Sequence, residues 1–222
     1  MRGFAGFGSG MMMAPVFAIL FGPVETVAIV ILMEIVASIQ LTPKAFPEIQ
    51  WRFVGPMSIA AALFMPVGAY FLGTLDPEFM TRTMAGVVLV FVVVLLTGWR
   101  YEGEKKFLPT LGIGAASGTL MAATSMGNPP VLLFMLSSRD SATTNRANII
   151  GYFAITQFVL LLVLLVMDLL SWPPVFRAAL LSPPYLFAAW LGVRLFHQAS
   201  EILYRRIALC FLFAVAAYGL LR

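Results

Sequence analysis

Three long stretches without a charged residue decide what this chain can fold into. They are Val54–Leu75, Thr83–Trp99 and Ile149–Met167. A transmembrane helix needs about 20 mainly apolar residues to cross a bilayer core of ~30 Å, and each stretch is near that length. Charged residues make up 11% of the chain, whereas a soluble domain carries about 25%. We therefore expect an all-α, polytopic membrane protein that crosses the lipid bilayer several times.

The rest of the composition argues against several function classes. The 222 residues include one histidine, His197, and one cysteine, Cys210, too few for a His/Cys metal site or a nucleophile–base–acid set. The thirteen methionines have no such partners, so core packing is favoured over copper binding. The net charge of +4 is attributed to basic cytoplasmic loops rather than to a nucleic-acid partner. We expect no enzyme activity, cofactor or metal.

The stretch Gly114–Val131, GAASGTLMAATSMGNPPV, interrupts an apolar segment that extends from Leu108 to Leu136. Glycine and two prolines follow one another closely at its end, which is incompatible with a plain spanning helix. Backbone groups freed in hydrocarbon cost several kcal/mol each unless protein or trapped water satisfies them. A break at this depth is therefore interpreted as a place where a ligand meets the backbone.

The distribution of basic residues predicts that this segment is a hairpin. If it crosses the membrane once, lysine and arginine are divided equally between the two sides. If it breaks near Gly127 and returns, the second side holds only Arg82 and Arg177. The first side then holds Lys44, Arg52, Arg100, Lys105, Lys106, Arg139, Arg146, Arg194, Arg205 and Arg206. Because basic residues concentrate on the cytoplasmic side, we expect a hairpin with two arms of about 14–16 residues, short of a full crossing.

The two halves of the chain have matching organisation. Each begins with a small-residue break followed by proline and an apolar run, at Gly6–Val16 and at Ser125–Val131. Paired interrupted segments point to the binding site of a transporter. We predict one membrane domain of two repeats, 1–103 and 104–222, each a broken-helix hairpin followed by three spanning helices. The other expected spans are Gly3–Leu20, Val24–Leu41, Arg177–Phe196 and Arg206–Leu221, with a loop at Trp172–Pro174.

The breaks supply the candidate site for a small anionic substrate. A turn between two half-helices leaves N–H groups unpaired, and a helix N-terminus carries partial positive charge. The candidate binding residues of the second half are Ser125, Gly127, Asn128, Pro129 and Pro130, and those of the first half are Gly6, Gly8, Ser9 and Gly10. The alternative is a turn that only permits close helix packing. That packing role is favoured for Gly114, Ser117 and Gly118, because small residues let membrane helices approach closely.

Three further polar residues are candidates. Glu34 lies near the middle of an apolar run, where a carboxylate is costly and usually functional, so it is a candidate for proton coupling; the alternative is a hydrogen-bonded structural group. Arg146, at the start of a helix, would draw anions toward the site or only fix orientation. Gln157 would face the cavity or bond a neighbouring helix.

These residues carry a resemblance to the sulfite exporter TauE/SafE family of membrane transporters. The first half has GFAGFGSG followed by Ala14-Pro15, and the second has GAASG followed by GNPP. The family pattern of G-x-x-S-G, a glycine-rich turn into Pro-Pro and a later arginine is matched by Gly114, Ser117, Gly118, Gly127, Pro129, Pro130 and Arg146. Gly68–Leu96 also resembles the family's passage from the third to the fourth helix. The departures are a shortened first half-helix, and Ser125 and Asn128 where glycine is common.

The resemblance implies a secondary transporter or facilitator that exports sulfite- or sulfonate-type anions across a bacterial-type inner membrane. Coupling to protons would involve Glu34. The alternatives are a transporter of another small organic anion, such as a carboxylate, and a non-transporting membrane scaffold or assembly factor. A homo-oligomer is compatible with either reading.

Overall fold

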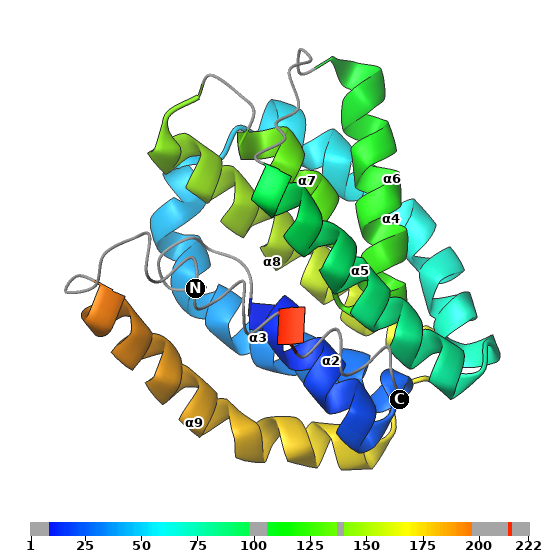
Figure 1. Ribbon diagram of the computed structural model, residues 1–222. Helices are drawn as coiled ribbons and strands as arrows, with labels where there is room; N and C mark the ends of the chain where they lie inside the picture. Colours follow the sequence, from blue (N-terminus) through cyan, green and yellow to red (C-terminus); the bar gives the residue numbers. More distant parts are fainter. Residues whose placement is uncertain (1–8, 98–105, 137–139, 197–212, 215–222) are drawn as a thin grey trace.

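The computed structural model describes residues 9–97, 106–136, 140–196 and 213–214, and each regular element within these ranges is helical (Figure 1). In chain order the elements are α2 (Ser9–Phe21), α3 (Pro23–Ala45), the 3₁₀ turn η1 (Phe46–Glu48), α4 (Trp51–Thr74), α5 (Pro77–Thr97), α6 (Phe107–Thr124), α7 (Asn128–Leu136), α8 (Ala142–Val166) and α9 (Trp172–Phe196).

Five of the described helices, α3, α4, α5, α6 and α8, are long and apolar enough to cross a membrane. Two helices are shorter: α2 has 13 residues and α7 has nine. Large apolar side chains such as Leu63, Val90 and Phe158 are more than half exposed, as expected of residues that face lipid. The predicted class is therefore confirmed, and the chain is an integral, multi-pass membrane protein.

Helices α4 and α6 run in the same direction and pack closely, because glycines let their backbones touch. A Cβ atom built on Gly114 would lie 2.4 Å from the Met57 carbonyl oxygen. One built on Gly118 would lie 2.2 Å from that of Ala61. From the other side, a Cβ on Gly68 would lie 2.1 Å from the Thr119 carbonyl oxygen. This contact fixes α6, and the break that follows it, against α4.

The segment α6–α7 enters and leaves at the same end of the bundle. Phe107, the first residue of α6, lines a small cavity with Arg52 at the start of α4. Asn148, in the second turn of α8, is bound to Gln50, also at the start of α4: Gln50 N–H donates to Asn148 Oδ1 at 2.7 Å, and Asn148 Nδ2 donates to Gln50 Oε1 at 3.0 Å. The arms have 18 and nine residues, so the expectation of two similar arms was wrong.

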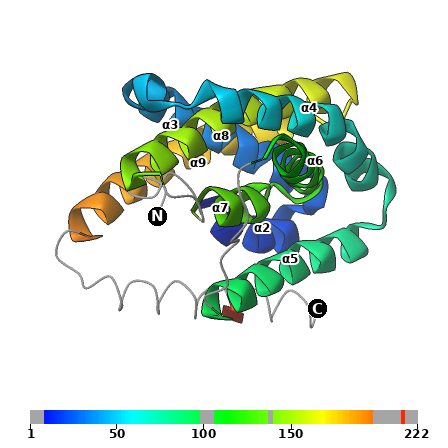
Figure 2. The same cartoon turned by 90° about the horizontal axis from the view of Figure 1, so that it is seen from above.

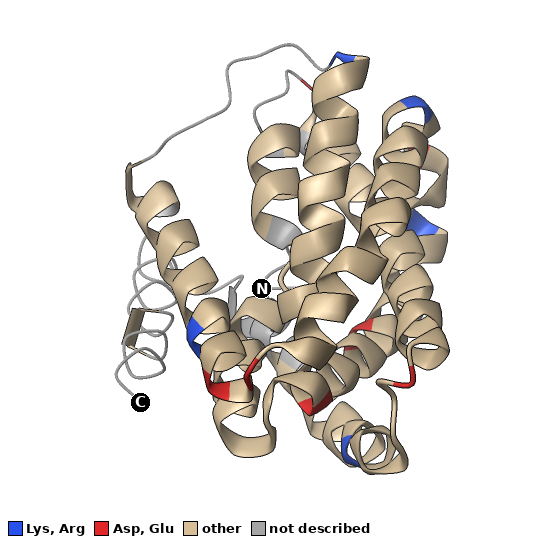
Figure 3. Cartoon of the chain, turned by 90° about the vertical axis from the view of Figure 1, so that its right-hand side faces the viewer, with Lys and Arg blue, Asp and Glu red and all other residues tan. Residues whose placement is uncertain are grey.

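Basic residues lie toward the two ends of the bundle (Figure 3). Lys44, Arg52, Lys106 and Arg146 lie at the end where α4, α6 and α8 begin. Arg82 and Arg177 lie at the opposite end, paired with Glu78 at 2.5 Å and with Glu25, respectively. Since basic residues mark the cytoplasmic side, we expect the end with these four cations to face the cytoplasm.

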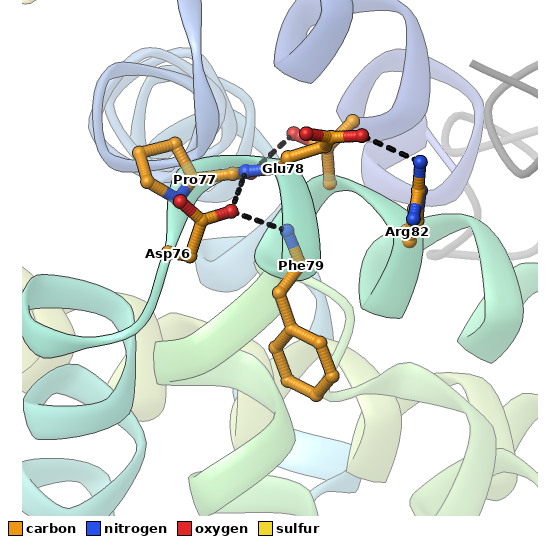
Figure 4. Close-up of polar contacts among 6 residues, drawn as sticks. Asp76, Pro77, Glu78, Phe79 and Arg82 are labelled. Carbon is orange, nitrogen blue, oxygen red and sulfur yellow. Dashed lines mark hydrogen bonds and ion pairs between the residues drawn. The ribbon is translucent and has the colours of Figure 1, made fainter.

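Two helices begin earlier than their apolar runs, at the end opposite the cytoplasm. Helix α5 starts at Pro77 because the Asp76 carboxylate caps it, accepting the N–H groups of Glu78 at 2.9 Å and Phe79 at 3.1 Å (Figure 4). Helix α9 starts at Trp172, where a loop was expected. The two prolines that suggested the loop occupy its first turn, where proline is tolerated because its missing N–H has no helical partner.

The glycine contact between α4 and α6 gives a stability prediction. We expect Gly118→Ala to lower the free energy of unfolding in detergent by about 2 kcal/mol, as overpacking of a close contact does. Gly112→Ala is the matched control, because a Cβ at Gly112, also on α6, meets nothing within 4 Å. Thermal unfolding of both purified variants measures the difference. Equal midpoints would show that α4 and α6 are not held this closely.

The ends assigned above predict which sites an impermeant thiol reagent reaches from each side. In a Cys210→Ser background, single cysteines at Lys106 and Ser141 are expected to be labelled from the same side of intact vesicles. A cysteine at Thr81 is expected to be labelled from the other side. A crossing of the whole α6–α7 segment would place Lys106 and Ser141 on opposite sides, which the same experiment detects.

Candidate functional site

Glu34 lies at the middle of the 23-residue α3 and is 7% exposed. Both of its carboxylate oxygens accept hydrogen bonds from other helices. The Ser9 hydroxyl on α2 donates to Oε1 at 2.5 Å, and Gln157 Nε2 on α8 donates to Oε2 at 2.8 Å. A buried carboxylate is tolerated only when it is bonded in this way, so Glu34 ties α2, α3 and α8 together.

Gln157 is itself held by a second residue of α3. The Ser38 hydroxyl, one turn beyond Glu34, donates to Gln157 Oε1 at 2.5 Å. The amide of Gln157 is 0% exposed and spans the two α3 side chains. The structure therefore places Gln157 in a polar chain that joins the two halves of the sequence.

The break after α6 is made by Ser125 rather than by Gly127. Ser125 has the left-handed conformation, with φ 58° and ψ 13°, and its N–H donates to the Met121 carbonyl at 2.8 Å. Its hydroxyl donates to the Thr124 carbonyl at 2.6 Å. The Met126 N–H is accepted by the Thr124 hydroxyl at 3.2 Å. The Ser125 N–H, the Met126 N–H and the Thr124 carbonyl are thus satisfied within the break itself, as hydrocarbon requires.

Gly127 is buried against the last turns of α6. A Cβ atom there would lie 2.6 Å from Met121 Cβ and 2.8 Å from the Ser117 carbonyl oxygen, so no side chain fits. The Ser117 hydroxyl donates to the Gly127 carbonyl. Gly127 therefore allows the chain to turn back closely against α6. Ser117 does more than allow helices to pack, because its hydroxyl forms a hydrogen bond with the break.

Tyr152 on α8 completes this arrangement and was not singled out in the sequence. Its hydroxyl donates to Ser117 Oγ at 2.9 Å, and both side chains are 0% exposed. The available signal was a tyrosine inside an apolar span, since a buried tyrosine hydroxyl usually has a hydrogen-bond partner. Which partner it would find depends on the α6–α8 contact, which the sequence does not reveal.

The first turn of α2 meets the break after α6 beside Glu34. A Cβ atom built on Gly10 would lie 3.2 Å from the Ser125 carbonyl oxygen and 3.7 Å from Glu34 Oε1. Viewed from above the bundle, α2 and α7 lie near its middle, between α5 on one side and α3 with α8 on the other (Figure 2). At about 1.5 Å rise per residue, α2 and the stretch of α3 up to Glu34 have similar lengths, so their meeting point lies deep in the membrane. We take Ser9, Gly10, Glu34, Ser125 and Gln157 as the candidate site.

The start of α7 borders this site but offers few donors. Asn128 is its first residue, and the next two, Pro129 and Pro130, have no N–H. The Asn128 backbone N–H is therefore the one donor in the first three positions of α7; its side chain lies outside the described part. Pro129 and Pro130 line a mainly apolar cavity of about 620 Å³ between α5, α6 and α7, and neither proline has an N–H to donate to an anion.

The remaining candidates are not brought to this place or lie outside the described residues. Arg146 is exposed in the first turns of α8, and its separation from Gln157 along the helix is about 16 Å at 1.5 Å per residue. Gly6 and Gly8 lie outside the described residues. Within the described ranges, no group of three or more His, Cys, Asp or Glu side chains is arranged to hold a metal ion.

Comparison with known proteins identifies one protein family that matches nearly the whole chain. No curated protein matches it, and no solved structure matches it. The family description "Sulfite exporter TauE/SafE" matches residues 1–219 of the 222. The match confirms the resemblance carried by the glycine and proline motifs of the two halves. The chain therefore belongs to the sulfite exporter TauE/SafE family of membrane transporters.

Proposed function

We propose that this chain is a secondary transporter or facilitator that exports small sulfur-containing anions, of the sulfite or organosulfonate type, across the inner membrane. The observation that carries the proposal is the meeting of Gly10 and Ser125 beside the buried carboxylate of Glu34. In support, the start of α2 in the first half lies against the interruption after α6 in the second, and transporter sites built from internal repeats bring such segments together.

The proposal includes two repeats, 1–103 and 104–222, that face each other across this point. In its support, each half contributes a short helix beside the site, α2 and α7, and a long helix whose polar residue joins the other half. Those residues are Glu34 on α3 and Gln157 on α8, bonded at 2.8 Å. Movement of one half against the other would expose the site to each side in turn.

Electrostatics explains how an anion would be accepted next to a carboxylate. Two negative charges about 4 Å apart repel strongly where the dielectric constant is low, so an anion binds beside Glu34 when that carboxyl holds a proton. The positive end of the α7 dipole and the Asn128 N–H favour the anion. Binding of anion and proton would then be linked, and Glu34 is the proton-coupling residue of the proposal.

Substitution of Asn128 tests whether the anion meets the backbone at the break. Asn128→Pro removes both the side chain and the N–H, while Asn128→Ala removes the side chain alone. Proline is tolerated at the first position of a helix, so the fold is expected to persist. Flux is measured in reconstituted vesicles loaded in turn with 35S-labelled sulfite, with organosulfonates and with short carboxylates. We expect flux of the sulfur anions to fall about tenfold further in Asn128→Pro than in Asn128→Ala, a difference equivalent to about 1.4 kcal/mol.

Equal flux in the two Asn128 variants would contradict binding at this N–H. Movement of short carboxylates in preference to every sulfur anion would contradict the proposed substrate class. If folded wild-type protein moves none of these anions in either direction, the transport proposal itself fails.

Replacement of Glu34 tests proton coupling. Glu34→Gln keeps the shape but fixes the side chain as neutral, so anion flux is expected to lose its response to an imposed pH gradient while anion binding persists. Glu78→Gln is the matched control, because Glu78 is exposed and paired with Arg82 at the opposite end of the protein from the cytoplasm. Flux is measured in vesicles with and without the gradient. A gradient response in Glu34→Gln equal to that of wild type would remove Glu34 from the coupling step.

A further inference from the structure

We propose that Tyr152 is a positioning residue: acting through Ser117, it sets the orientation of the Gly127–Asn128 peptide at the break. This inference rests on the proposed function for its meaning, since that peptide carries the donor that would face the anion. Tyr152 belongs to α8, Ser117 to α6, and the peptide to the start of α7. Three helices therefore converge on one peptide bond.

The direction of the hydrogen bonds makes the chain specific. A serine hydroxyl has a single hydrogen but accepts further bonds through its lone pairs. Because the Tyr152 hydroxyl donates to Ser117 Oγ at 2.9 Å, the Ser117 hydrogen is committed to the Gly127 carbonyl. Both side chains are 0% exposed, so water does not compete for either bond. The chain thus has one direction, from tyrosine to serine to carbonyl.

Fixing the carbonyl also fixes the N–H of the same peptide. The described residues contain no cis peptide bonds, and in a planar trans peptide the C=O and N–H point in opposite directions. The Gly127 carbonyl is held toward Ser117, so the Asn128 N–H points away from α6. With Pro129 and Pro130 next in the chain, no other N–H in the first three positions of α7 would take its place.

Gly127 lacks the backbone restriction that a side chain gives. Glycine has more backbone freedom than any other residue, and a side chain that would limit it does not fit beside Met121. The Tyr152–Ser117 chain therefore supplies the restriction that a Cβ would otherwise give. The same helix carries Gln157, five residues further on, bonded to Glu34. Helix α8 consequently links the position of the break to the position of the carboxylate.

The test combines Tyr152→Phe, Ser117→Ala and the double variant, with Thr110→Val as the control. Thr110 is a buried hydroxyl on α6 that donates to the Lys106 carbonyl at 2.8 Å, away from the break. We expect Tyr152→Phe to raise the KM for sulfite about fivefold, the factor that a hydrogen bond of about 1 kcal/mol corresponds to, with the maximal rate unchanged. Because the two residues act in one chain, the double variant is expected to match Ser117→Ala alone.

A second measurement does not depend on transport. Hydrogen–deuterium exchange of the segment 124–131 in purified protein is expected to be faster in Tyr152→Phe than in wild type, and unchanged in Thr110→Val. A loss of maximal rate or of folded protein without a change in KM would indicate a merely structural role and overturn the inference. Unchanged exchange in Tyr152→Phe would overturn it as well.

The two proposals fail in different ways. If wild-type protein moves sulfite and Asn128→Pro abolishes this, but Tyr152→Phe has the wild-type KM, the proposed function stands and the positioning role is refuted. If wild-type protein moves no sulfur anion, the proposed function is refuted. The exchange measurement then decides by itself whether Tyr152 fixes the peptide.

Discussion

The structure depends on the requirement that backbone groups freed inside a membrane find partners in the protein. The interruption between α6 and α7 frees several such groups at once. The Ser125 N–H donates to the Met121 carbonyl, the Met126 N–H donates to the Thr124 hydroxyl, and the Gly127 carbonyl accepts from the Ser117 hydroxyl. The small polar residues around the break are therefore explained first by this need. A ligand can use only the groups that remain after the protein has satisfied the rest.

The close contact between α4 and α6 makes this arrangement rigid enough to hold a site. Gly114 and Gly118 place the backbone of α6 directly against that of α4, and the break at Ser125 follows about two turns later. On the other side of α6, Tyr152 fixes Ser117. The break is thus held from α4 through packing and from α8 through a hydrogen bond, while Gly10 brings α2 to the same point.

The sequence predicted the membrane class and several residues of the site, for physical reasons that operate locally. Apolar runs identify spans whatever surrounds them, and Glu34 and Gln157 stand out because polar groups in hydrocarbon are costly. The contacts between particular residues could not be predicted from the sequence. The break was expected near Gly127, yet the residue with left-handed backbone is Ser125. Tyr152 was missed because its role depends on how α8 lies against α6.

The two prolines at the start of α7 restrict how this protein can change shape. Inside a helix, a proline ring clashes with the carbonyl four residues earlier, which for Pro129 is that of Ser125, the left-handed residue. Joining α6 and α7 into one straight helix would therefore cost the clash of this ring and the hydrogen bond that proline cannot donate. In the proposed transporter, α6 and α7 are accordingly expected to move as separate segments, with the interruption between them retained.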